Sequence, residues 1–417
     1  MKLLQVDMVA EAREKLREHF ENKDWGQELV PLGNACGRYL AEELRSEADL
    51  PAFRRSVVDG YAVAAKDTFG VSDTIPVFLD LAGAVEMGLP CDILLKPGQA
   101  VYVPTGGMLP QGSDAVVMVE YTEKLDDRTI AVYKPVSPNG GIMNAGDDVR
   151  IGQTLYSKGH RLTAKDMGML AAIGKDQVLV WRQPLVSILS TGDEMIPIHQ
   201  TPEPGQVRDI NTHALSAFVS QSGAIVHHTG IVKDVYEELV HAVQEALLVS
   251  DLVLLSGGSS AGSKDMTAEV IDSLGKPGVI THGLAMKPGK PTILGVIGDK
   301  LVVGLPGHPM AAIIAYQVMV DHFLKRVCFG NQEEAIAIPA TITENIHAGE
   351  GRETYQLVTL LGRRTAGNAG TVWEAAPIHA KSGAISQLML ADGMIRIDAL
   401  SEGARAGSQV DVILFDR

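Results

Sequence analysis

The sequence has few cysteines, few aromatic residues and no long apolar run. Its three cysteines are odd in number and far apart, so neither a disulfide framework nor a Cys-x-x-Cys metal site is visible. No stretch of about 18 apolar residues occurs, and the N-terminus lacks the apolar core of a signal peptide. Basic runs are also missing, and the net charge of -15 argues against general affinity for nucleic acid. We therefore expect a soluble, cytoplasmic protein with no nucleic-acid partner and no membrane partner.

The sequence is long and rich in glycine, and part of it alternates apolar strands with amphipathic helices. A chain of 417 residues exceeds the size at which one core keeps growing, so roughly two to four domains are expected. Residues 184–328 alternate short apolar strands with amphipathic helices, such as the helix over residues 235–249. This alternation predicts a doubly wound, mostly parallel sheet with helices on both faces, which is a three-layer α/β domain.

The flanking segments have other patterns. Residues 50–146 contain short β-type runs broken by Gly, Pro and Asp, which predicts an inserted mainly-β domain. Residues 1–49 and 147–183 have helical character, with Asp7 as a candidate N-cap, and together predict a small helical linking domain. Short strands over residues 335–417 predict a C-terminal β-barrel domain.

The α/β part is organised around residues 252–267, which read LVLLSGGSSAGSKDMT. Residues 252–255 read as a buried parallel strand, and a helix is expected from about Met266. Between them stand backbone N–H groups and hydroxyls from Ser256, Gly257, Gly258, Ser259 and Ser260. A glycine-serine loop between a strand and a helix N-terminus is an anion cradle, at the place where open α/β sheets bind ligands. A plain turn of the same composition is the alternative interpretation.

Three more loops place polar side chains at predicted strand ends. They are residues 190–194 (STGDE), 233–234 (KD) and 286–291 (MKPGKP). Four carboxylates at this edge, meeting near Lys287 and Lys290, would suit Mg²⁺ and phosphate oxygens; they are Asp193, Glu194, Asp234 and Asp265. Each side chain by itself could instead be solvated or cap a helix. Their concentration at one sheet edge favours the functional interpretation.

Seven motifs follow one another along the chain. They are DGYAV from Asp59, PTGGMLPQGSDAVV from Pro104, AGDDVRIG from Ala145, STGDE from Ser190, SGGSSAGSKD from Ser256, MKPGKP from Met286 and GLPGHP from Gly304. In this order and spacing they resemble the MoeA/gephyrin E-domain family, the molybdopterin molybdenumtransferases. The resemblance covers essentially the whole chain, and it implies an elongated homodimer of four domains.

The resemblance also implies an activity and a set of site residues. The activity is Mg²⁺-dependent insertion of molybdate into adenylylated molybdopterin (molybdopterin-AMP), with release of AMP, in molybdenum cofactor biosynthesis. The implied catalytic residues are Asp59, Thr105, Asp148, Glu194, Asp234, Asp265, Lys287 and Lys290, of which Glu194, Asp234 and Asp265 are the metal candidates. The implied pterin-binding or molybdate-binding residues are Thr191, Gly192, Asp193, Ser256, Gly257, Gly258, Ser259, Ser260, Pro306, Gly307, Pro309 and Arg352.

In the family, the positions matching Asp59, Thr105 and Asp148 approach the site across the dimer interface, so the resemblance implies a catalytic unit of two chains. Other proteins of molybdenum cofactor biosynthesis, or recipient molybdoenzymes, are the expected further partners.

Some motif positions depart from the family pattern. Met143 stands where the family commonly has an arginine, His308 replaces an asparagine, and Ala311 replaces a serine. These departures favour, as an alternative, a catalytically altered paralogue that binds or delivers molybdopterin. His308 also has a structural interpretation, as a cap of the helix that follows it. A scaffolding role like that of gephyrin is the third hypothesis, for which the chain offers no partner domain or long linker.

Overall fold

The computed structural model of the protein describes residues 6–257, 263–364, 371–379 and 383–415, with the backbone alone at 263–265 and 364. The chain forms two compact units. Unit 1 comprises Met1–Glu42, Lys158–Thr163 and Val178–Arg417, and unit 2 comprises Glu43–Ser157 and Ala164–Gln177. The residues of the predicted linking domain contribute to both units, and the division into four domains stays a prediction.

Unit 1 contains a six-stranded sheet. Its order is β16 (Ile225–Val232), β13 (Leu185–Thr191), β17 (Leu252–Gly257), β21 (Lys300–Leu305), β20 (Ile293–Ile297) and β18 (Pro277–His282). The first four strands are parallel, and β20 runs antiparallel to both β21 and β18. Because two reversals restore the direction, β18 points the same way as β21. The carboxyl ends of five strands therefore share one edge of the sheet.

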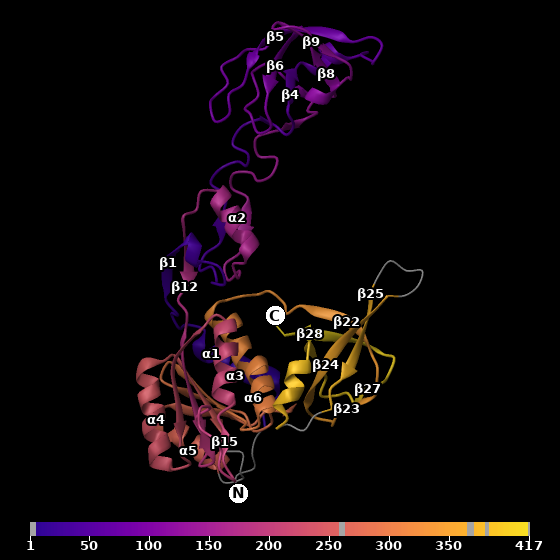
Figure 1. The fold of residues 1–417 in the computed structure, drawn as a ribbon. Coiled ribbons are helices and arrows are strands. Elements are labelled where there is room, and N and C mark those ends of the chain that lie inside the picture. Colours follow the sequence, from indigo (N-terminus) through magenta and orange to yellow (C-terminus); the bar gives the residue numbers. More distant parts are fainter. Residues whose placement is uncertain (1–5, 258–262, 365–370, 380–382, 416–417) are drawn as a thin grey trace. The chain divides into compact units, whose positions relative to one another are not determined.

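Helices cover both faces of this sheet (Figure 1). One face packs on α4 (Tyr236–Val249) and α5 (Ser263–Leu274), and the other on α1 (Val9–Phe20), α3 (Asn211–Gln221) and α6 (Pro309–Ala315). Alternate strand residues point to opposite faces, so Leu254 joins one core and Val253 the other. After α6 the chain continues in two π-helical segments, Tyr316–Asp321 and Phe323–Cys328. The predicted three-layer α/β fold is confirmed.

The predicted N-cap role of Asp7 is wrong. Helix α1 begins at Val9 with Met8 at the cap position, where the Met8 N–H donates to the Glu11 carboxylate at 3.0 Å. The Asp7 side chain instead accepts hydrogen bonds from Lys15 Nζ and Thr281 Oγ1, both at 2.6 Å. Asp7 is only 7% exposed, so a contact with the sheet takes precedence over the cap.

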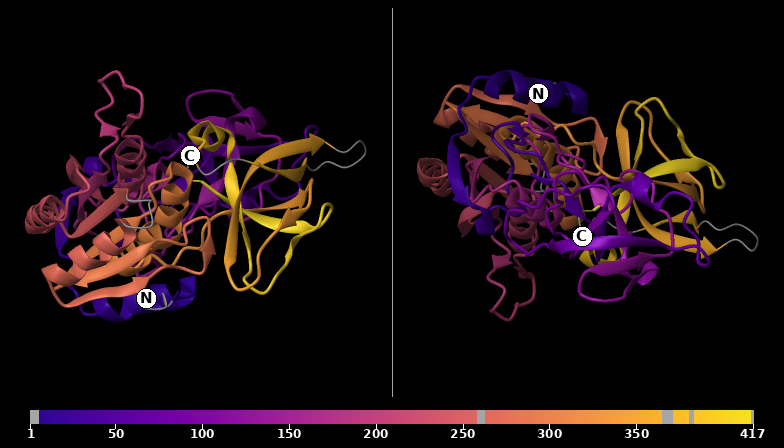
Figure 2. Two further views of the ribbon diagram at one scale, coloured as in Figure 1. Left: turned by 90° about the horizontal axis from the view of Figure 1, so that it is seen from below. Right: turned by 90° about the horizontal axis from the view of Figure 1, so that it is seen from above.

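The C-terminal part of unit 1 is a closed five-stranded barrel, as predicted. Its strands run in the order β24 (Glu353–Arg364), β25 (Thr371–Pro377), β22 (Ala337–Ile342), β28 (Gln409–Leu414) and β26 (Gly393–Ile397), and pairing of β24 with β26 closes the barrel. Figure 2 shows these strands beside the α/β part of the same unit. A short strand, β19 (Met286–Lys287), leaves the α/β part and pairs with the start of β24.

Unit 2 is built mainly of strands, as expected for the inserted domain. Its sheet has the order β7 (Ala115–Met118), β4 (Gly60–Val63), β6 (Gln99–Val103), β5 (Val77–Ala84), β9 (Thr129–Val132) and β8 (Thr122–Lys124). Further elements are β2 (Leu44–Arg45) with β11 (Thr154–Tyr156), β3 (Arg55–Ser56) with β10 (Ile142–Met143), and helix α2 (Ala164–Ala172).

Short pairs complete the fold in the parts of the chain that the structure describes. They are β1 (Gln27–Pro31) with β12 (Gln177–Trp181), β14 (Met195–Ile196) with β15 (Val207–Arg208), and β23 (Ile346–His347) with β27 (Gly403–Ala404). The 3-10 turns are Leu32–Asn34, Ala65–Thr68, Val119–Tyr121 and Ile385–Leu390. Among the described residues, none of the helices has the length and apolar character needed to cross a membrane.

Candidate functional site

A group of carboxylates lies at the carboxyl ends of β13 and β16. The Asp234 backbone N–H donates to Asp193 Oδ1 at 3.3 Å, and the Asp234 side chain is hydrogen-bonded to Thr191. The Glu194 carboxylate folds back over Gly192, with Oε2 only 2.8 Å from where a Cβ on that glycine would stand. Burial raises the pKa of Asp234, and the negative charges of Asp193 and Glu194 add to the effect. The structure thus brings together five predicted site residues from two loops.

The end of β17 is the predicted anion cradle. Ser256 is almost fully buried, and Gly257 has a φ of +150°, a conformation that favours glycine. Gly258, Ser259 and Ser260 lie outside the described residues. Helix α5 begins at Ser263, three residues before the predicted start. Asp265 had been predicted in the loop, but it lies in the first helical turn. The conformation of its side chain is likewise outside the described part.

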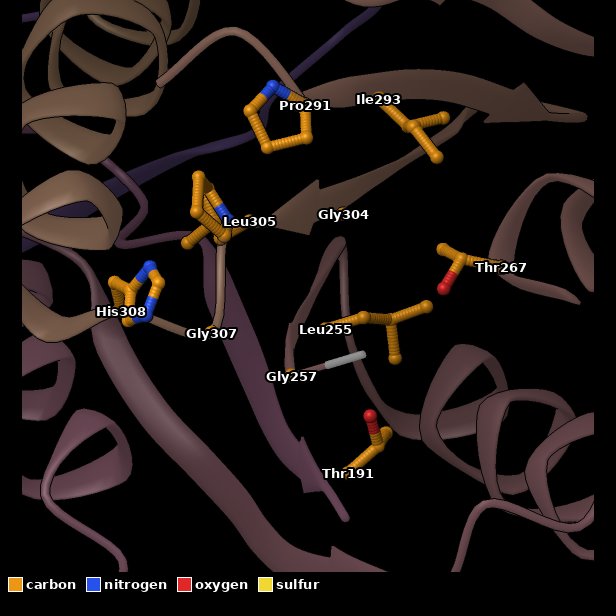
Figure 3. Close-up of a pocket in the computed structure, with 11 residues that line it drawn as sticks. Thr191, Leu255, Gly257, Thr267, Pro291, Ile293, Gly304, Leu305, Gly307 and His308 are labelled. Carbon is orange, nitrogen blue, oxygen red and sulfur yellow. The ribbon is translucent and has the colours of Figure 1, made fainter. Parts of the chain in front are cut away.

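A small cavity opens beside Gly257, at the same sheet edge. It has a volume of about 190 Å³, and its wall includes Thr191, Gly257, Thr267 and His308. Figure 3 shows His308 and Thr267 on opposite sides of the Leu255–Gly257 strand end. Pro306 and Gly307, which had been predicted as binding residues, also line the cavity. Loops that are far apart in the sequence therefore line one cavity.

The capping interpretation of His308 is wrong for its side chain. His308 occupies the cap position of α6, but its imidazole makes no capping hydrogen bond, and Pro309 follows as the first helical residue. The side chain is exposed and lines the cavity. Ala311 is buried in the first turn of α6.

Cations reach the same edge on the loop after β18. Lys287 and Lys290 are exposed, and no carboxylate among the described residues forms an ion pair with either. Lys287 pairs with Thr354 in the β19–β24 register. Arg352 directly precedes β24, so its backbone lies close to that of Lys287. The Glu353 N–H donates to the Ala285 carbonyl at 2.8 Å and fixes this junction. The barrel thus delivers its predicted arginine next to the predicted lysine loop.

Asn211 is a site residue that the sequence analysis missed. Its Nδ2 donates to Ser256 Oγ at 2.8 Å and to the Gly307 carbonyl at 2.9 Å, so one side chain joins the two loops that flank the cavity. Asn211 is 4% exposed, and its Oδ1 has no partner among the described residues. The local sequence indicates only that a helix starts here: the Asp209 carboxylate accepts a hydrogen bond from the Thr212 N–H at 3.0 Å, in the first turn of α3.

We expect Asn211→Ala to lower the free energy of unfolding by about 1–3 kcal/mol, because two buried acceptors lose their donor. It should also weaken binding of the pterin that the resemblance implies, because the two loops would no longer be held together. The matched control is Asn331→Ala: that asparagine is also buried and donates to Gly159 O at 2.9 Å, but it lies away from this edge. A loss of pterin affinity of equal size in both variants would contradict a positioning role for Asn211.

Unit 2 carries three predicted site residues. The Thr105 N–H and hydroxyl donate to Asp59 Oδ1 at 2.7 and 3.0 Å, and these bonds lower the pKa of Asp59. Asp148 is exposed, and its N–H donates to the Leu50 carbonyl at 3.0 Å. Asp59 and Thr105 are therefore neighbours, whereas Asp148 is held in a different turn of the same unit.

Met143, which stands where the family commonly has an arginine, has Arg55 as its neighbour. Met143 pairs with Arg55 across the β3–β10 ladder, and Arg55 Nη2 lies 3.6 Å from Met143 Sδ. A guanidinium therefore stands beside the position at which the sequence analysis noted a missing one. Arg55 and Met143 are far apart in the sequence and adjacent in the structure.

Three family models match successive parts of the chain. They are "MoeA N-terminal region (domain I and II)" at residues 8–174, "Probable molybdopterin binding domain" at residues 187–326, and "MoeA C-terminal region (domain IV)" at residues 339–415. These ranges account for most of the sequence, in the order of the seven motifs.

Relatives and solved structures agree with these matches. A molybdopterin molybdenumtransferase of Nostoc is 32% identical over 79% of this chain and 76% of its own length. One from Bacillus subtilis is 29% identical over 95% of this chain and 91% of its own length. The crystal structure of a molybdopterin biosynthesis MoeA protein from Pyrococcus horikosii superposes with a TM-score of 0.80 at 36% identity, covering 99% of this chain and 100% of that one.

The fold and these matches define a transferase of molybdenum cofactor biosynthesis with a molybdopterin-binding domain. The chain belongs to the MoeA family, the molybdopterin molybdenumtransferases.

Proposed function

We propose that this protein inserts molybdate into adenylylated molybdopterin and releases AMP, in a Mg²⁺-dependent reaction of a cytoplasmic homodimer. The observation that carries the proposal is the presence of both signs of charge along one edge of the sheet. Glu194 and Asp234 stand at the ends of β13 and β16, and Lys287 and Lys290 follow β18. A reaction that joins an oxyanion to a phosphate-bearing ligand needs both kinds of charge.

The residues of this edge divide into three proposed roles. The Ser256–Gly257 strand end and the loop from Pro306 to Pro309 hold the pterin ligand through backbone groups. Lys287, Lys290 and Arg352 attract molybdate, which is a substrate. A guanidinium suits an oxyanion because its N–H groups form a fixed fork. The carboxylates orient the water that attacks the phosphoanhydride.

The carboxylate group is chemically suited to Mg²⁺. The negative charges of Asp193 and Glu194 add to the burial that raises the pKa of Asp234, and no cation among the described residues pairs with the three carboxylates. The described residues alone form no group of three or more side chains around a metal position. Mg²⁺ usually takes one or two protein carboxylates and completes its shell with water and ligand phosphates, so Glu194 and Asp234, with Asp265, would hold it. When bound, the ion would neutralise charge on the phosphate oxygens.

The decisive experiment measures AMP release from adenylylated molybdopterin by the purified protein. We expect release that requires both Mg²⁺ and molybdate, with molybdenum retained on the pterin, and we expect a chelator of divalent cations to stop it. Release without molybdate would contradict coupled insertion. Tight pterin binding without any AMP release would overturn the transferase proposal.

That second outcome would favour the alternative, a molybdopterin-binding or delivery paralogue. Its sequence support came from Met143, His308 and Ala311. The Arg55 guanidinium beside Met143 weakens part of this support, because the position keeps a neighbouring positive charge. Arg55→Gln offers a direct comparison: in an active transferase it should reduce turnover, whereas a carrier has no turnover to lose.

A further inference from the structure

A larger cavity lies elsewhere in unit 1, on walls that do not include the candidate site. Its volume is about 1060 Å³. The part discussed below has three sources: α1 gives Arg13, the π-helical segments give Val318 and Arg326 with His322 between the segments, and β26 gives Met394, Arg396 and Ile397. π-helical turns are uncommon and often occur at functional sites. The cavity exceeds the size of most small-molecule sites, so space does not limit its occupant.

Positive side chains gather at one end of this cavity. Burial lowers the pKa of Arg13; Tyr355 and Glu353 oppose this shift, and the charges of Arg396 and Arg326 add to it. Burial also lowers the pKa of His322 to about 4, with further contributions from Arg13 and Arg326. At neutral pH the imidazole is therefore uncharged, and the guanidinium groups of Arg13 and Arg326 act on it. We call Arg13, His322, Arg326 and Arg396 the cation cluster.

The geometry holds Arg13 in place without neutralising it. Its Nε and Nη2 donate to the Val318 carbonyl at 3.2 and 2.7 Å, which leaves Nη1 without a partner among the described residues. Val318 lies in the first π-helical segment, so this segment and α1 together fix the guanidinium. A cation held by a neutral carbonyl keeps its charge available for a ligand.

Nearby carboxylates offset only part of the cluster's charge. Arg326 Nη2 pairs with Glu334 at 3.2 Å, and Glu353 accepts a short hydrogen bond from the Tyr355 hydroxyl. In the parts of the chain that the structure describes, no carboxylate forms an ion pair with Arg13, His322 or Arg396. Excess positive charge in a partly buried site is costly in a protein whose net charge is -15, unless an anion joins it.

Other charged groups in the cavity wall are paired or stand apart from the cluster. Lys325 pairs with Asp321 at 3.1 Å, and His160 with Glu333 at 2.7 Å. The remaining charged wall residues are Arg161, Asp398, Arg405 and Asp411. Of these, Arg405 is a cation of the same wall that does not contribute to the shifts at Arg13 and His322.

We propose that this cavity binds the phosphate group of a small organic phosphomonoester, with Arg13, Arg396 and the neutral His322 imidazole as its donors. A dianion matches the excess of guanidinium charge better than a carboxylate does, and a guanidinium can hold two phosphate oxygens at once. The apolar side chains of Val318, Met394 and Ile397 lie along the same wall and give the organic part a surface to pack on. This site goes beyond the proposed transferase activity and shares no residue with the candidate site.

The test uses the full-length protein and measures binding by calorimetry. The probes are ribose 5-phosphate, ribose and inorganic phosphate. We expect ribose 5-phosphate to bind, inorganic phosphate to bind more weakly and ribose not to bind. Arg396→Gln should weaken binding about tenfold or more, because a charge-assisted hydrogen bond is lost. In imidazole NMR spectra, ligand binding should raise the pKa of His322, with the signal assigned from His322→Gln.

Arg405→Gln is the matched control, since it removes the same charge from the same cavity wall outside the cluster. It should change affinity less than about twofold. Arg13→Gln would also remove the bonds to the Val318 carbonyl, so Arg396, which is exposed, carries the test. Equal binding by wild type and Arg396→Gln, or no binding of either phosphate at millimolar concentration, would overturn the proposal. Equal affinity for ribose 5-phosphate and inorganic phosphate would show that the site binds free phosphate. That result would overturn the proposal that the ligand is an organic phosphomonoester. AMP release tests the transferase separately, so the two proposals can fail independently.

Discussion

Gly257→Ala is expected to lower the free energy of unfolding by about 3 kcal/mol and turnover by more than about 100-fold. A Cβ at this position would stand 2.1 Å from the Thr191 carbonyl oxygen and 2.4 Å from its hydroxyl. The φ of +150° adds backbone strain for any residue with a side chain. Strands β13 and β17 would have to separate at their carboxyl ends, where the carboxylate group and the anion cradle meet. Chemical denaturation and AMP release measure the two effects.

Gly298→Ala is the matched control for this prediction. Gly298 also has a positive φ, of +63°, but no atom lies within 4 Å of a Cβ built there. It should therefore cost only the backbone strain, about 1 kcal/mol, and leave turnover unchanged. If Gly257→Ala behaved like Gly298→Ala, the close approach of the two strand ends would not matter to the site.

The parts of the fold that the sequence predicted well are those set by local pattern. Residues 252–255 had to be a buried strand, since they are too few for a helix and too apolar for a surface strand, and β17 is buried along its length. Leu239, Val243 and Leu247 recur at helical spacing and are all buried on α4. Periodicity reports which face of an element is apolar, and burial of that face is what the fold achieves.

The direction of β20 was not predicted. The sequence analysis took residues 277–305 as part of a mostly parallel alternation, but β20 and β21 form an antiparallel hairpin with a two-residue loop, Gly298-Asp299. A glycine at the first position of such a loop is a hairpin signal, because it supplies the required positive φ. That signal was present in the sequence.

The parts of the site that the sequence did not predict are contacts between distant segments. Asn211 acts on Ser256 and on Gly307, and neither contact can be inferred from the residues around it. Arg352 reaches the Lys287 loop only because β19 adds to the barrel strand β24. In the same way, Arg55 and Met143 are neighbours through a strand register that joins residues far apart in the sequence. Motifs identify chemical groups, whereas tertiary pairing decides which groups are neighbours.

Whether two chains build one site can be tested with two inactive variants. Asp59→Asn keeps an oxygen that can accept from Thr105 but removes the charge, so unit 2 should keep its fold. Asp265→Asn makes the same change in the first turn of α5, in unit 1. Each variant alone should release AMP at less than about 1% of the wild-type rate, because a positioned charge is lost.

Mixing these two variants should restore activity if each site takes unit 1 from one chain and unit 2 from its partner. In an equal mixture about half of the dimers are hybrids, and one of the two sites in each hybrid then carries neither substitution. Recovery of about a quarter of wild-type AMP release is therefore expected. The control mixes Asp59→Asn with Thr105→Ala, whose changes both fall in unit 2, so every site keeps one defect and no activity returns. No recovery in the first mixture, with subunit exchange verified by mass spectrometry, would mean that each chain completes its own site.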